Sequence, residues 1–96
     1  MKTIKATAEF DKWERKLKDR EAAARVQVRI RRLSLGNPGQ LRNLKGGVSE
    51  MKIDFGPGYR IYFTERNGEI VILLCGGTKK TQGKDIANAQ SLAARL

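Results

Sequence analysis

The spacing of apolar residues predicts helices in the first third of the chain. Phe10, Trp13 and Leu17 recur at helical intervals, and a second helical stripe consists of Ala22, Val26, Ile30 and Leu33. The short alternating segment at residues 2–6 predicts a strand ahead of them. We expect the two helices to run antiparallel and to bury one apolar stripe against the other.

Cap and turn residues mark the ends of these helices. Thr7 and Asp19 stand directly ahead of the two stripes, where their side chains can accept hydrogen bonds from the first free amides. Gly36-Asn37-Pro38-Gly39 is expected to end the second helix, because proline disfavours the helical region for the residue before it. A basic loop over residues 40–47 follows.

The second half of the chain reads as strands and one final helix. Residues 48–54 and 59–65 alternate between apolar and polar around a Gly-Pro-Gly turn, which predicts an antiparallel hairpin. Residues 69–75 are apolar without alternation, so we expect a strand covered on both faces that ends at Gly76-Gly77. A basic loop over residues 78–83 then leads to an Ala-rich helix from about Lys84. The pattern predicts one α+β domain over residues 1–96.

Charge indicates the kind of partner. The chain has 96 residues with 20 Lys and Arg against 10 Asp and Glu, a net charge of +10, and 13 of the basic residues precede Gly46. Such an excess attracts polyanions over a screening distance of about 10 Å. Nucleic acid or an acidic protein is therefore the favoured partner, and a merely solvated basic surface is the alternative.

The missing residue types exclude several chemistries. There is no histidine, so a Ser-His-Asp triad, a Cys-His pair, a two-histidine ribonuclease mechanism and an HExxH zinc site cannot be assembled. The carboxylates are dispersed among positive charges, and we expect neither a metal nor a cofactor. Cys75 lies in an apolar run and is expected in the core. No segment resembles a signal peptide or a membrane span, which predicts a cytoplasmic protein.

Phosphate chemistry by cationic side chains remains possible. Lys and Arg can hold a phosphate and stabilise the charge of a transition state, while a Lys, Tyr or Glu with a shifted pKa can move a proton. The alternative for Lys52 and Arg60 is pairing with Glu50 and Asp54 across the sheet, and that for Lys79 and Lys80 is solvated loop charge. The residues that could converge on one site are Lys45, Lys52, Arg60, Tyr62, Lys79, Lys80 and Gln82.

Three segments, Arg42–Asp54, Gly56–Phe63 and Ile70–Gln82, together resemble the RelE/ParE toxin superfamily. More narrowly they resemble the HigB-like addiction module killer proteins of bacterial type II toxin–antitoxin systems. The resemblance extends over nearly the whole chain, and its specificity lies in the combined pattern. It implies two N-terminal helices packed on a small antiparallel sheet, here followed by a C-terminal helix.

The resemblance also implies an activity. Many members are ribosome-dependent endoribonucleases that cut mRNA in the A site by attack of the 2′-hydroxyl on the adjacent phosphate. A cognate helix-turn-helix antitoxin neutralises them, and we expect an acidic antitoxin segment over the positive cleft. On matching positions the resemblance implies Lys45 and Lys52 as phosphate or base candidates, Arg60 as the transition-state clamp, and Lys79 and Lys80 as phosphate contacts. Together with the charge pattern, this predicts the catalytic residues Lys52, Arg60, Lys79 and Lys80 and the RNA-binding residues Arg25, Arg29, Arg32, Arg42, Lys45, Tyr62 and Gln82.

One departure from the family keeps other functions open. Nucleases of the family often carry a Tyr or His near the C-terminus, whereas this chain has neither after Tyr62. A DNA gyrase inhibitor of the ParE kind therefore stays a candidate. So does a non-catalytic nucleic-acid-binding module, because Arg25, Arg29 and Arg32 could contact phosphates without catalysis.

Overall fold

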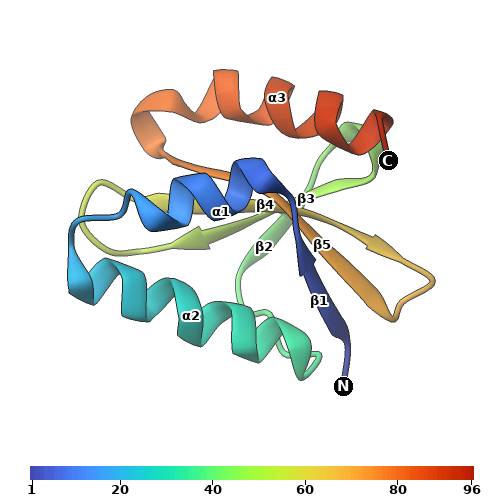
Figure 1. The fold of residues 1–96 in the computed structure, drawn as a ribbon, viewed down its shortest axis with the longest axis horizontal. Coiled ribbons are helices and arrows are strands. Elements are labelled where there is room, and N and C mark those ends of the chain that lie inside the picture. Colours follow the sequence, from blue (N-terminus) through green and yellow to red (C-terminus); the bar gives the residue numbers. More distant parts are fainter.

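A five-stranded mixed sheet with helices on both faces forms the molecule, and it confirms the predicted α+β class (Figure 1). The computed structural model describes residues 1–96. The strand order is β1-β5-β4-β3-β2. The elements are β1 (Thr3–Ala6), α1 (Ala8–Arg15), α2 (Arg20–Ser34), β2 (Leu41–Asn43), the 3-10 turn η1 (Lys45–Gly47), β3 (Val48–Ile53), β4 (Tyr59–Arg66), β5 (Ile70–Thr78), the 3-10 turn η2 (Lys79–Thr81) and α3 (Gln82–Ala94).

The predicted helix caps are present. The Thr7 hydroxyl accepts from the amide of Phe10 at 3.1 Å, and the Asp19 carboxylate accepts from the amide of Glu21 at 2.9 Å. At the other end of α2, Gly36 has φ of 80°, a left-handed conformation that glycine adopts without strain. Local sequence signals therefore set both ends of α2.

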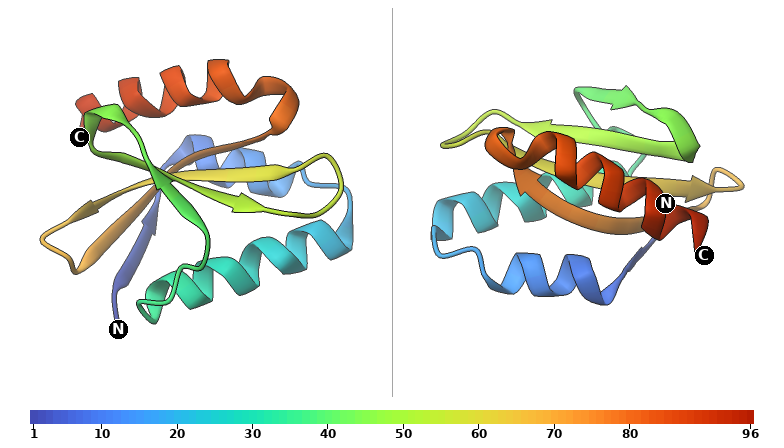
Figure 2. Two further views of the ribbon diagram at one scale, coloured as in Figure 1. Left: turned by 180° about the vertical axis from the view of Figure 1, so that it is seen from behind. Right: turned by 90° about the horizontal axis from the view of Figure 1, so that it is seen from above.

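Two apolar clusters cover the two faces of the sheet. Phe10 of α1 with Val26 and Leu33 of α2 packs against sheet residues such as Ile61 and Phe63. The expectation that the helices bury their stripes against each other is wrong in this respect, because both stripes lie on the sheet. On the other face Ala89 of α3 packs with sheet residues, and Figure 2 shows α3 and α2 on opposite sides of the sheet. As predicted, β5 is covered on both faces.

The sheet differs from the prediction at both edges. β1 pairs with β5 in parallel, with Thr3 opposite Ile70, so the sheet is mixed. β2 lies inside the expected basic loop and pairs antiparallel with β3. All three β2 side chains are exposed, so burial left no alternating pattern that could have revealed the strand. No helix combines the length and the apolar character that crossing a bilayer requires.

The prediction that Gly76-Gly77 ends a strand is also wrong. β5 continues to Thr78, and α3 begins at Gln82, slightly before the expected Lys84. A Cβ on Gly76 would lie 2.4 Å from the Trp13 ring, and one on Gly77 would lie 1.8 Å from the Asp85 carboxylate. The two glycines therefore let α1 and α3 approach the strand from opposite faces.

Candidate functional site

A cavity opens on the α3 face of the sheet, beside Gln82 at the start of α3. Strand register places Arg42 opposite Glu50, Glu50 opposite Tyr62, and Lys52 opposite Arg60, so these side chains share one face. The cavity measures about 230 Å³. It is lined by Gln40, Leu41, Arg42, Glu50, Lys52, Arg60 and Gln82.

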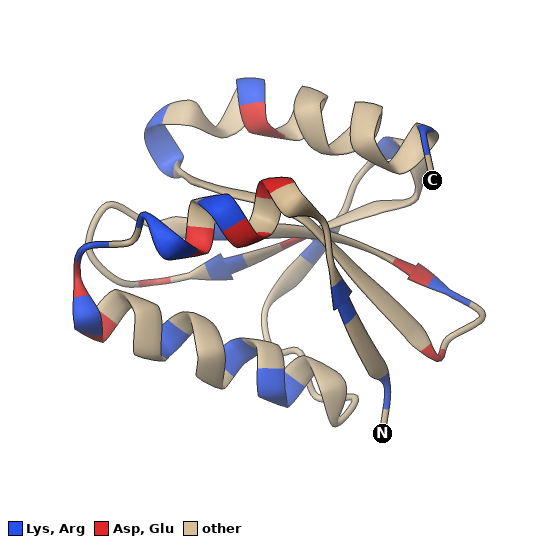
Figure 3. Ribbon diagram, in the orientation of Figure 1, with Lys and Arg blue, Asp and Glu red and all other residues tan.

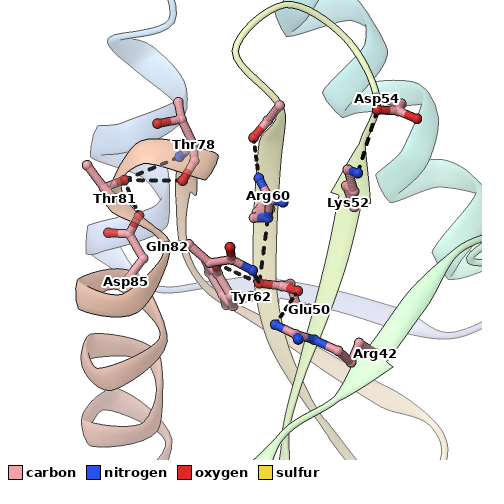
Figure 4. A network of polar contacts seen from close by, with 11 residues as sticks. Arg42, Glu50, Lys52, Asp54, Arg60, Tyr62, Thr78, Thr81, Gln82 and Asp85 are labelled. Atoms are coloured by element: carbon pink, nitrogen blue, oxygen red, sulfur yellow. Dashed lines mark hydrogen bonds and ion pairs between the residues drawn. The ribbon is translucent and has the colours of Figure 1, made fainter.

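The Glu50 carboxylate lies at the centre of a polar network beside this cavity (Figure 4). Tyr62 Oη and Gln82 Nε2 each donate to Glu50 Oε2 at 2.9 Å. Arg42 Nη2 lies 3.0 Å from Glu50 Oε1, and the Glu50 side chain is only 7% exposed. A carboxylate this buried is stable because two hydrogen-bond donors and two cationic neighbours compensate its lost hydration.

Arg60 keeps free hydrogen-bonding capacity next to the cavity. Its Nη1 donates to the Gly58 carbonyl at 2.9 Å, and its Nε lies 3.8 Å from Glu50 Oε2, beyond hydrogen-bond range. The Arg60 Nε is buried and has no hydrogen-bond partner. Because Arg60 also lines the cavity, the rest of its guanidinium is suited to an oxygen-rich ligand.

Lys52 lies at the mouth of the cavity. Its side chain is 39% exposed, and its Nζ lies 3.8 Å from Asp54 Oδ1. The cross-sheet pairing that the sequence offered as an alternative to catalysis is therefore present between Arg60 of β4 and Glu50 of β3, whereas Lys52 pairs with Asp54 at the end of its own strand. Neither ion pair is short, so both cations can still bind a ligand.

Two other titratable side chains near the site are held in their neutral forms. Burial, and then the hydrogen bond to Glu50, raises the pKa of Tyr62 well above its ordinary value. Tyr62 therefore acts as a donor that holds Glu50. Burial, and then the nearby Asp85 carboxylate, raises the pKa of Cys75 to about 12. The thiol belongs to the core, as predicted, and stays protonated.

Lys79 and Lys80 stand in η2, next to the cavity. A Cβ built on Gly58 would lie 3.6 Å from Lys79 Cβ and 3.3 Å from Arg60 Nη1, so Lys79 and Arg60 flank the same glycine. Both lysines are exposed and neither lines the cavity. Both lysines lie just ahead of α3, and Figure 3 shows Lys and Arg positions at this end of the helix.

The structure does not bring the α2 arginines or Lys45 into the cavity. Arg25, Arg29 and Arg32 line a separate groove on the opposite face of the sheet, because α2 packs there. The Lys45 carbonyl accepts from Gln90, eight residues and about 12 Å along α3 from Gln82. Of the proposed site residues, those that meet at the cavity are Arg42, Lys52, Arg60, Gln82 and, through Glu50, Tyr62.

Glu50 also lines the cavity, although from the sequence it was expected only as a possible ion-pair partner of Lys52 or Arg60. Its place on the polar side of the alternating strand was the one available signal, because it shares that side with Lys52. No three His, Cys, Asp or Glu side chains come together in an arrangement that could hold a metal ion. The site therefore offers cations and amides as ligand-binding groups.

Known proteins share the whole of this domain. A Haemophilus influenzae (strain ATCC 51907 / DSM 11121 / KW20 / Rd) protein described as "Uncharacterized protein" is 50% identical over 93 residues, covering 97% of this chain and 94% of that protein. Residues 8–95 match the model of the family described as "Phage derived protein Gp49-like (DUF891)". This match includes every residue that lines the cavity. The chain therefore belongs to the Gp49-like (DUF891) family of phage-derived proteins.

Proposed function

We propose that this protein is the toxin of a bacterial type II toxin–antitoxin system and cleaves mRNA on the ribosome, which inhibits translation. The observation that supports the proposal is the cavity in which Arg42, Lys52 and Arg60 converge from three neighbouring strands. Three cations around one small open space suit a ribose-phosphate link. The description of the family names no activity, so the proposal depends on this geometry and on the resemblance to RelE/ParE toxins.

In the proposed reaction the RNA 2′-oxygen bonds to phosphorus, and the bond from phosphorus to the 5′-oxygen breaks. Arg60 holds the phosphate and stabilises the extra negative charge of the transition state. Lys52, exposed at the mouth, is the group placed to take the proton of the 2′-hydroxyl when its amine is neutral, and water protonates the departing 5′-oxygen. Lys79 and Lys80 contact flanking phosphates. Glu50 keeps Arg42 and Arg60 in place, and no metal takes part.

The test compares cavity variants on translating ribosomes. Lys52→Ala and Arg60→Ala are expected to slow mRNA cleavage at least about 100-fold, as removal of a transition-state donor does. Arg66→Ala is the matched control, because Arg66 is exposed at the far end of β4, and it should stay within about twofold of wild type. Primer extension locates the cuts, and a thermal melt of each variant shows that it is folded.

Two outcomes would contradict this proposal. Wild-type cleavage by both cavity variants would reject the assigned site. Loss of cleavage in EDTA, with cross-linking used to keep the ribosomes intact, would reject a metal-independent mechanism.

Gyrase inhibition is the second candidate, because no Tyr or His follows Tyr62 and α3 occupies the C-terminal segment instead. The same purified protein is assayed for inhibition of DNA supercoiling by gyrase. Inhibition of gyrase without ribosomal cleavage would select this candidate. RNA binding with neither activity would indicate a non-catalytic binding module.

A further inference from the structure

We infer that the groove between α2 and the end of β3 is a docking surface for an acidic amphipathic helix of a partner protein. The groove measures about 520 Å³. It lies on the opposite face of the sheet from the cavity. The inference rests on the proposed function in one respect, which is that the partner protein is the antitoxin. Its lining is Glu21, Ala24, Arg25, Val28, Arg29, Arg32, Ile53 and Asp54.

Apolar side chains supply part of the groove. Val28 is 56% exposed in the middle of α2, although its neighbour Val26 is fully buried. Ala24 is also exposed on α2, and Ile53 of β3 contributes at the base. An apolar strip rimmed by charge is typical of protein contact sites. A partner that places apolar side chains on Val28 would remove this strip from water.

Three arginines run along the groove, and contacts within the protein hold two of them, Arg25 and Arg29. The three arginines occur at i, i+4 and i+7 on α2 and span about 10 Å. Arg25 lies over the Phe55 ring at 4.4 Å and pairs with Glu21 at 3.0 Å. Arg29 donates to the Lys52 carbonyl at 2.6 Å. Guanidinium groups already held in place lose little freedom on binding, and carboxylates at the same helical spacing on a partner would meet them.

The mixture of groups favours a protein over RNA. Val28 and Ala24 add little to contact with a phosphate backbone, while Glu21 and Asp54 among the lining residues can accept hydrogen bonds from polar groups of a protein partner. A second copy of this chain is disfavoured, because a symmetric contact would place arginine against arginine in a protein of charge +10. An acidic amphipathic helix satisfies both the arginines and the apolar strip.

The location distinguishes the groove from the cavity. The groove faces the α2 side of the sheet, and the cavity faces the α3 side. The two sites adjoin at Asp54, which lines the groove and pairs with Lys52, whereas Arg60 lines only the cavity, so a helix in the groove leaves Arg60 accessible. The expectation of an acidic segment over the cationic cleft is a different mode of capture, and the two modes respond to different substitutions.

The experiment first looks for a helix-turn-helix protein encoded beside this chain, whose absence would reject the antitoxin as the partner, and then measures its binding by calorimetry with purified proteins. Val28→Asp and Arg32→Glu are each expected to weaken binding at least tenfold, because one removes an apolar contact and the other reverses a charge of the groove. Arg31→Glu is the matched control, since Arg31 is exposed on the same helix but does not line the groove, and it should stay within twofold. Val28→Asp should keep wild-type cleavage on ribosomes.

Each other outcome overturns the inference in its own way. Equal binding by wild type, Val28→Asp and Arg32→Glu would reject the docking surface and leave the proposed function standing. Failure of wild type to bind the neighbouring protein would reject the antitoxin and the docking surface together. Equal losses in Arg31→Glu and Arg32→Glu would indicate diffuse attraction. If Arg32→Glu bound single-stranded RNA more weakly than wild type but bound the partner protein equally well, the groove would be assigned to RNA.

Discussion

At the scale of single residues, the site depends on a negative charge inside a positive cluster. Glu50 accepts from Tyr62 and Gln82 and pairs with Arg42, three side chains from three different elements. It also lies beneath the buried Arg60. Removing the carboxylate would leave a buried hydroxyl without an acceptor and a buried guanidinium without a counter-charge. Glu50 therefore stabilises the arrangement that the proposed chemistry uses.

We predict that Glu50→Ala lowers the free energy of unfolding by about 3 kcal/mol, the usual cost of removing one partner of a buried ion pair. Tyr62→Phe should cost about 1 kcal/mol, because it deletes one donor and leaves Glu50 with others. Urea unfolding measures both. Glu65→Ala is the control, since Glu65 forms an ion pair with Lys2 at the surface, and should change stability by less than about 1 kcal/mol. A Glu50→Ala protein as stable as the Glu65→Ala protein would contradict the prediction.

Alternation along a strand was enough to foresee part of the site. It placed Lys52 and Arg60 on one polar side of a hairpin, and the register confirms that they face each other. It could not place Arg42 beside them, because β2 carries no burial pattern. The α2 arginines were grouped with the site from charge alone, and only tertiary packing decides which face of a sheet a helix covers.

At the scale of elements, β5 shows how two glycines can belong to a strand. The sequence pattern treated Gly76 and Gly77 as a break, which is their usual meaning after an apolar run. In the fold they are sites of close approach, because Trp13 of α1 lies against Gly76 on one face of the strand and Asp85 of α3 lies against Gly77 on the other. The information that decides between these meanings is a contact across more than 60 residues of sequence in the case of Trp13, which no local pattern contains.

We predict that Gly76→Ala destabilises the protein by about 2 kcal/mol, because the added methyl would overlap the Trp13 ring and force α1 outward. Gly83→Ala is the control within a helix. Gly83 has open space around its Cβ position and lies in the first turn of α3, so alanine should stabilise by about 0.5 kcal/mol. Thermal unfolding with tryptophan fluorescence reports both effects. Equal shifts in the two variants would show that Trp13 moves aside at no cost.

At the scale of the whole molecule, the charge of +10 is divided between the two faces of the sheet. Arg42, Lys52 and Arg60 serve the cavity, whereas Arg25, Arg29 and Arg32 serve the groove. Composition predicted the total, but the sheet decides the division. The number of charges that one RNA strand can engage is therefore much smaller than the net charge suggests.

This division predicts a shallow dependence of RNA binding on salt. If the three cavity cations together with Lys79 and Lys80 contact a single strand, the logarithm of the affinity should fall with the logarithm of salt concentration with a slope of about −3.5. Between about 50 and 200 mM KCl the affinity of a labelled RNA oligonucleotide, followed by fluorescence anisotropy, should fall about 100-fold. Arg42→Gln should make the slope shallower by about 0.7, and Lys45→Gln should leave it unchanged because Lys45 lies apart from the cavity. A slope steeper than about −5 would mean that cations on both faces engage RNA together, and the assignment of the groove to a protein partner would then be wrong.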